Sequence, residues 1–160
     1  MQTLRKECWN DGRSIQLADF YTFGYSGRPT EEILDALRQA AVSTVVDIRF
    51  TALSMYKPDF SKSNLKRIVE ERGLEYLHLP ELGVPRAIRL LAADRGTRSP
   101  IWEWYDENVV PKYIGKNLHW FLNLANHPIA LMCVEIDPEE CHRHRLFEAL
   151  ENQGLRGFDL

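Results

Sequence analysis

The sequence lacks several features that would place the protein outside the cell or within a membrane. It has only three cysteines among 160 residues, an odd number that does not suit a secreted disulfide framework. No apolar run approaches the roughly 18 residues that a membrane-spanning helix requires. The first residues are polar and mixed in charge, unlike the apolar stretch of a secretion signal. These absences predict a cytoplasmic protein with free thiols and no membrane partner.

The sequence also lacks a strong net charge, internal repeats and linker-like segments. Its formal net charge is −3, which gives no general attraction to nucleic acid. Its length and its hydrophobic content of 44% suit one domain with one core. We expect residues 1–19 to form a flexible lead-in and residues 20–160 to form the single domain.

Short apolar segments alternate with amphipathic ones through this domain. The segments predicted as strands are 20–26, 44–49, 74–79 and 129–134, and a short strand is expected near 158–160. Apolar residues at helical spacing predict helices over 30–41, 61–73, 87–93, 113–125 and 138–153, and another beginning near Trp102. Such alternation predicts an α/β fold, a three-layer domain with a mostly parallel sheet of four or five strands and helices on both faces.

In a sheet of this kind, binding sites form beyond the carboxyl ends of the strands. That rule selects Ser26, which follows the first predicted strand, and Asp47 and Arg49, which end the second. Asp47 and Arg49 lie on one face of their strand, where a structural ion pair explains them as well as substrate binding does. We treat all three as candidate substrate-binding residues.

The densest group of reactive side chains follows the fourth strand. Strand alternation places Cys133 and Glu135 on the same side. The sequence Asp-Pro-Glu-Glu at residues 137–140 is typical of a helix start, so the next three residues are expected in the first turns of that helix. The candidate catalytic residues are therefore Cys133, Glu135, Cys141 and His142, and Arg143 is a candidate for binding an anionic group.

Three chemistries suit this group. A cysteine-based phosphatase or sulfurtransferase is suggested because residues 46–49 resemble the early strand of rhodanese-like domains, but the acidic residues after Cys133 would repel an anion. Zinc bound by Cys133, Cys141 and His142 together with a carboxylate suits the residue types. Adjacent residues of one helix do not easily face one ion, however, and the two thiols are not expected to meet, so no cofactor is predicted.

The third chemistry fits the predicted geometry best. In it, Glu135 or His142 acts as a general acid or base, while Arg49 or Arg143 holds an anionic group. The predicted function is an enzyme that acts on a small anionic or nucleotide-like substrate. The alternative is a non-catalytic module that binds nucleic acid or protein. An aromatic-rich stretch with interleaved lysines could stack bases, although ordinary core packing also explains it: Trp102, Trp104, Tyr105, Lys112, Tyr113, Lys116 and Trp120.

These motifs together resemble those of the domain of unknown function 488 family. The matching segments, in order between about Thr22 and Leu150, are Thr-Phe-Gly-Tyr-Ser at 22–26, Val-Asp-Ile-Arg at 46–49, Leu-His-Leu-Pro-Glu-Leu-Gly at 77–83, and Cys133-Val-Glu135 through Cys141-His142-Arg143. Ala52 stands where the family usually has proline, and Met55 and Tyr56 replace a more basic stretch. The resemblance implies a functional centre around the last motif, and it implies no established activity.

Overall fold

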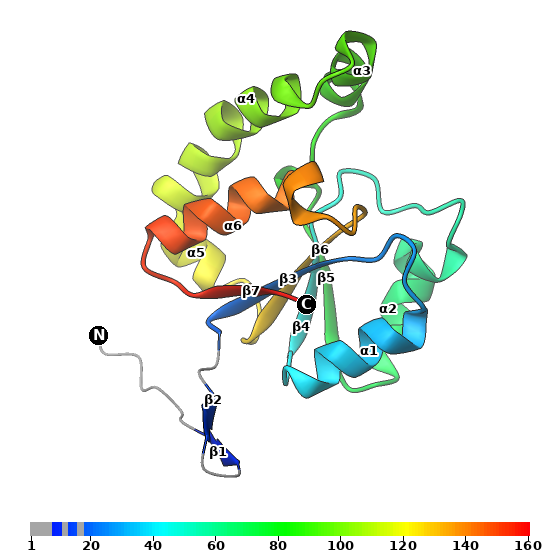
Figure 1. The fold of residues 1–160 in the computed structure, drawn as a ribbon, viewed down its shortest axis with the longest axis vertical. Coiled ribbons are helices and arrows are strands. Elements are labelled where there is room, and N and C mark those ends of the chain that lie inside the picture. The colour runs from blue at the N-terminus through cyan, green and yellow to red at the C-terminus, as the bar shows by residue number, and fades with distance from the viewer. Residues whose placement is uncertain (1–7, 11–12, 16–17) are drawn as a thin grey trace.

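The computed structural model describes residues 8–10, 13–15 and 18–160 (Figure 1). Its strands form two sheets. A two-stranded antiparallel pair precedes a five-stranded parallel sheet with the order β5-β4-β6-β3-β7. The strands are β1 (Cys8–Asn10), β2 (Arg13–Ile15), β3 (Phe20–Gly24), β4 (Thr44–Asp47), β5 (Glu75–His78), β6 (Ile129–Cys133) and β7 (Gly157–Asp159).

Helices cover both faces of the parallel sheet, which confirms the predicted α/β architecture. The helices are α1 (Thr30–Gln39), α2 (Lys62–Glu70), α3 (Arg86–Arg95), α4 (Ser99–Asn108), α5 (Leu118–Leu122) and α6 (Arg143–Asn152). Helices α1 and α2 lie on one face, and α4, α5 and α6 lie on the other (Figure 1). Alternate residues of β6 enter the two cores: Ala130 and Met132 pack with α1 and α2, whereas Leu131 and Cys133 pack with α4 and α6.

The strand register brings the predicted strand ends to one edge of the sheet. Gly24 of β3 is paired with Cys133 of β6, and Asp47 of β4 is paired with both Met132 of β6 and His78 of β5. The segments that follow these four strands therefore leave the sheet at the same edge. The 3-10 turns Pro58–Phe60 and Pro80–Leu82 lie in the segments after β4 and β5.

Two predicted helices are interrupted in the structure. The helix expected over 113–125 is replaced by a π-helical turn, Val110–Gly115, followed by α5. The Asn117 side chain donates to the Lys112 carbonyl over 2.6 Å, and so takes an acceptor that a continuous helix would use. The helix expected over 138–153 is a 3-10 turn, Pro138–Glu140, followed by α6 from Arg143.

The lead-in expected over residues 1–19 lies in part outside the described residues. Within the described part, β1 and β2 precede the strand that the sequence indicated as the first. Among the described residues, no helix has the length and hydrophobicity that crossing a membrane requires.

Candidate functional site

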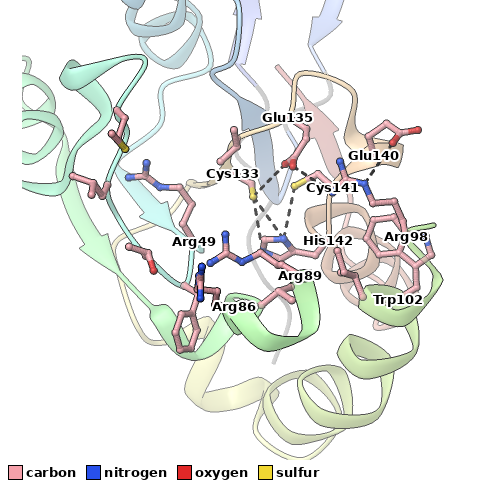
Figure 2. A pocket seen from close by; sticks show the side chains of 17 residues that line it. Arg49, Arg86, Arg89, Arg98, Trp102, Cys133, Glu135, Glu140, Cys141 and His142 are labelled. Atoms are coloured by element: carbon pink, nitrogen blue, oxygen red, sulfur yellow. Dashed lines mark hydrogen bonds and ion pairs between the residues drawn. The ribbon is translucent and has the colours of Figure 1, made fainter. Parts of the chain in front are cut away.

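A cavity of about 390 Å³ lies at the carboxyl edge of the parallel sheet (Figure 2). The segment after β6 supplies one part of its wall, and the segment after β4 supplies another. Helices α3 and α4 and the residue before α4 complete it. The polar and charged residues and the tryptophan in the wall are Arg49, Thr51, Arg86, Arg89, Arg98, Trp102, Cys133, Glu135, Glu140, Cys141 and His142.

Two thiols and one imidazole converge on this wall. The Sγ atom of Cys133 lies 3.6 Å from Nδ1 of His142, and the Sγ atom of Cys141 lies 3.9 Å from the same nitrogen. The two sulfurs and one ring nitrogen of His142 lie within 4.8 Å of one another. Figure 2 shows both sulfur atoms beside the His142 ring. These three side chains could hold a metal ion.

The closeness of the two sulfurs corrects the expectation that the thiols of Cys133 and Cys141 do not meet. The prediction assumed a continuous helix, but the chain at Cys141 is extended, with φ −122° and ψ 144°. The Asp137 carboxylate accepts the Glu139 amide over 2.9 Å, and the Cys141 amide donates to the Pro138 carbonyl, which closes the turn before α6 starts. This break turns the Cys141 side chain toward the end of β6.

His142 is fixed by contacts on both ring nitrogens. Nε2 lies 3.2 Å from the Ile48 carbonyl oxygen, which can only accept, so Nε2 donates to it. Nδ1 lies near both sulfurs, and Cys133 Sγ is also 3.9 Å from Nε2. Burial by itself would lower the pKa of His142, but Cys141, the Ile48 carbonyl and Glu135 favour its charged form and the pKa is raised. Burial and the neighbouring Cys133 raise the pKa of the Cys141 thiol.

The acidic side chain of Glu135 lies close to these groups. Its Oε2 atom lies 3.8 Å from Cys133 Sγ, and its Oε1 atom lies 3.7 Å from an Arg98 nitrogen. Arg98 also pairs with Glu140 at 3.8 Å. The Glu135 side chain is 31% exposed, so it can reach a molecule in the cavity.

Asp47 and Arg49 form a buried ion pair at the end of β4. The Asp47 carboxylate accepts from Arg49 Nε over 2.8 Å, from Arg49 Nη2 over 2.6 Å and from the Tyr76 hydroxyl over 2.6 Å. Burial works against the charge of Arg49, but Asp47 outweighs it and raises the pKa of the guanidinium. Arg49 is part of the cavity wall, whereas Asp47 lies behind it and holds Arg49 in place.

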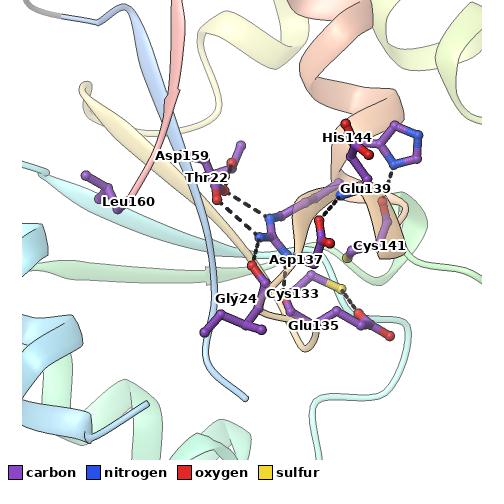
Figure 3. A network of polar contacts seen from close by, with 12 residues as sticks. Thr22, Gly24, Cys133, Glu135, Asp137, Glu139, Cys141, His144, Asp159 and Leu160 are labelled. Carbon is purple, nitrogen blue, oxygen red and sulfur yellow. Dashed lines mark hydrogen bonds and ion pairs between the residues drawn. The ribbon is translucent and has the colours of Figure 1, made fainter. Parts of the chain in front are cut away.

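The structure does not bring Arg143 to the cavity. Its side chain is completely buried, donates to the carbonyls of Glu135 and Ile136, and pairs with Asp159 at 3.2 Å. Figure 3 shows the surrounding polar network, in which Asp159 lies beside Thr22. Arg143 therefore fixes the main chain that carries Glu135.

Ser26 lies in a neighbouring groove rather than in the cavity. It is exposed, and its amide donates to the Val134 carbonyl over 2.9 Å. The groove also contains Arg28 and Lys57. Leu53, Met55 and Val134 border both hollows, which separates Ser26 from the cysteines.

Three arginines of the wall were missed in the sequence. Arg86 and Arg89 lie in the first turn of α3, and Arg98 immediately precedes α4. In the part of the chain that the structure describes, the side chains of Arg86 and Arg89 make no hydrogen bond or ion pair. The signal was available, because these residues follow β5 and the i, i+3 spacing places Arg86 and Arg89 on one side of a helix.

Most of the aromatic stretch serves packing. Tyr105 is completely buried and donates to the Leu82 carbonyl over 2.8 Å. Trp102 is the member of this stretch that reaches the cavity, and its ring lies 4.7 Å from that of His144. Lys112 and Lys116 are exposed away from the cavity wall.

The fold and this wall define an α/β domain with a polar cavity at the carboxyl edge of a parallel sheet. The family model described as "Domain of unknown function DUF488" matches residues 29–150 of the chain. The chain belongs to this family, as its motifs indicated. No curated protein and no solved structure matches the chain significantly.

Proposed function

We propose that this protein is an enzyme that acts on a small anionic, nucleotide-like substrate in the cavity beside Cys133. The observation that carries the proposal is the composition of the cavity wall, where a partly exposed carboxylate and four arginines line one space of about 390 Å³. A cavity of this volume suits a small molecule, and convergent charged groups would fix its orientation.

The arginines supply the affinity for an anion. Arg86 and Arg89 are exposed and have no carboxylate partner among the described residues, so their charges are available to a ligand. Arg49 adds a guanidinium whose position is set by Asp47. Guanidinium groups bind phosphate and carboxylate groups in a two-pronged manner, which favours a phosphorylated or carboxylated substrate.

Glu135 is the side chain best suited to move a proton. His142 has both ring nitrogens engaged, one with the Ile48 carbonyl and one with the two sulfurs. Glu135 has one oxygen near Arg98 and the other near Cys133, at distances that leave it free to approach a substrate. We therefore assign Glu135 as the general acid or base and Cys133 to the reactive wall beside it.

A cytoplasmic location is part of this proposal. Cys133 and Cys141 are close and are free thiols. A reducing compartment keeps such a pair from forming a disulfide.

The test is a turnover screen with the purified full-length chain. The panel contains phosphate monoesters, pyrophosphate, nucleoside mono- and diphosphates and small carboxylates, with products separated by chromatography. We expect turnover of at least one member, and loss of about a hundredfold or more in kcat with Glu135→Gln. Glu139→Gln is the matched control, because Glu139 is an exposed acid of the adjacent turn that does not line the cavity.

A non-catalytic binding module is the second candidate. It is favoured by exposed apolar and aromatic side chains in the loop after β4, where Met55 is 84% exposed and Tyr56 is fully exposed. On this alternative no member of the panel is converted, and Glu135→Gln has no activity to remove. Binding of a panel member without conversion would therefore count against the enzyme.

A further inference from the structure

We propose that Cys133, Cys141 and His142 bind one zinc ion through their two Sγ atoms and Nδ1. The sequence argued against this site because adjacent residues of one helix would not face one ion. The extended backbone at Cys141 removes that objection, since it places the side chains of residues 141 and 142 on the same cavity wall.

The sulfur–nitrogen distances are close to those of a tetrahedral zinc site. Zinc lies about 2.3 Å from sulfur and about 2.0 Å from nitrogen, so two ligands of a tetrahedron are roughly 3.5 Å apart for sulfur and nitrogen and roughly 3.8 Å apart for two sulfurs. The observed sulfur–nitrogen distances are 3.6 Å for Cys133 and 3.9 Å for Cys141. The whole set lies within 4.8 Å, so small side-chain adjustments complete the geometry.

The hydrogen bond of His142 is a second, independent indication. A histidine that binds a metal usually donates its other ring N–H to a carbonyl or carboxylate, which fixes the tautomer. His142 places Nε2 against the Ile48 carbonyl at 3.2 Å, and Nδ1 is the ring nitrogen that lies within 4 Å of both sulfurs. A catalytic cysteine–histidine pair requires only one thiol near Nδ1 of His142. A shared metal ion explains why the thiols of both Cys133 and Cys141 lie there.

The donor set selects the metal. Two thiolates and one imidazole favour zinc over magnesium or calcium, which prefer oxygen ligands. Three protein ligands leave a fourth position, and because all three line the cavity, that position faces the substrate space. Catalytic zinc sites have this arrangement, whereas structural sites are closed by four protein ligands.

The catalytic use of the ion rests on the proposed function, whereas its binding rests on the geometry alone. Glu135 lies 3.8 Å from Cys133 Sγ and would accept a proton from water in the fourth position. The resulting hydroxide would attack an electrophilic carbon or phosphorus of the substrate, and the leaving group would take the proton from Glu135. The net reaction is hydrolysis, in which one water is consumed.

The test measures zinc by mass spectrometry in the full-length protein purified without chelator. We expect about one zinc per chain in the wild type, and at least about tenfold weaker zinc binding in Cys133→Ser and in Cys141→Ser. Cys8→Ser is the matched control, because it removes the remaining cysteine of the sequence outside the cluster. It should keep the wild-type zinc content.

A second measurement does not depend on the variants' folding. Cobalt(II) added to chelator-treated wild-type protein should give the intense sulfur-to-cobalt absorption of thiolate ligation, and zinc should abolish it and protect both thiols from alkylation. A wild-type protein that takes up neither ion, with thiols equally reactive in the presence and absence of zinc, would overturn the proposal. So would full zinc retention in a folded protein that carries both serine substitutions.

The zinc site and the proposed function can fail separately. If the protein holds no zinc, and its turnover is lost in Glu135→Gln but unaffected by chelator, the zinc site is ruled out and the proposed enzymatic function is kept. If the protein holds one zinc per chain but converts no member of the panel, the zinc site is kept and the proposed enzymatic function is contradicted.

Discussion

At the residue scale, the backbone and the side chain of Glu135 have separate tasks. The Glu135 carbonyl accepts from the buried Arg143, while its carboxylate faces the cavity between Arg98 and Cys133. A guanidinium that the sequence suggested for an anionic ligand is therefore used to hold main chain. Substitution of Arg143 should therefore lower the stability of the fold, whereas substitution of Glu135 should lower turnover.

Arg143→Ala should lower the free energy of unfolding by about 3 kcal/mol or more. The substitution leaves the carbonyl oxygens of Glu135 and Ile136 and the Asp159 carboxylate without their buried donor. Urea unfolding measures the loss. Arg38→Ala is the control, since its pair with Asp35 is exposed and should contribute no more than about 0.5 kcal/mol. Equal, small effects of the two substitutions would contradict the assigned role.

Tyr76→Phe should flatten the dependence of stability on alkaline pH. Burial and the Asp47 carboxylate raise the pKa of Tyr76 above its ordinary value of about 10. Above that pH the tyrosine ionises in the unfolded chain but stays protonated in the folded one, so its contribution is complete below about pH 10 and is lost as the pH rises. Urea unfolding between about pH 8 and pH 11 should show a shallower decline for Tyr76→Phe. The exposed Tyr56→Phe should keep the wild-type slope, and identical slopes for all three proteins would refute the argument.

At the element scale, the site depends on how β3 meets the segment after β6. A Cβ atom on Gly24 would lie 1.7 Å from the Glu135 carbonyl oxygen. The backbone of β3 therefore approaches the backbone of Glu135 more closely than any residue with a side chain would allow. Glycine at this position lets the segment that carries Glu135 and the Pro138–Glu140 turn lie against the end of β3. The turn then sets the direction in which Cys141 and His142 leave it.

Gly24→Ala should displace that segment. Because the collision is with main chain, it cannot be relieved by a side-chain rotation, and we expect a loss of about 1–3 kcal/mol or more in unfolding free energy. Any turnover that depends on Glu135 should fall in the folded variant. Gly115→Ala is the control, because its nearest atom would be 3.9 Å away. Wild-type stability and activity in Gly24→Ala would show that this contact does not position the site.

At the scale of the whole molecule, the sequence pattern predicted the layers and the edge of the sheet that carries the cavity. The apolar segments around Val46 and Leu131 have the composition of buried parallel strands, and the strand-end rule selected Arg49 and Cys133. The layers and the edge of the sheet follow from local composition, because the apolar residues of each segment indicate that the segment is buried.

Long-range geometry accounts for what the sequence could not provide. Nothing local shows that Arg143 meets Asp159, or that β6 lies between β3 and β4. The break before α6 depends on a competition between a 3-10 turn and a helix that starts from the same residues, Asp137 and Pro138. Arg86 and Arg89 could have been selected by their position after β5, but their distance from Cys133 along the chain concealed the shared cavity.

Binding of pyrophosphate measured by calorimetry tests the central claim, that this cavity receives an anionic ligand, most directly. The wild type should bind one pyrophosphate, and the Arg86→Ala/Arg89→Ala double variant should bind it at least about tenfold more weakly, since a hydrogen bond to a charged group contributes roughly 1.5–3 kcal/mol. Arg95→Ala, at the far end of α3 and outside the cavity wall, should bind like the wild type. Equal affinity in the wild type and the double variant, or no binding by the wild type, would contradict the claim.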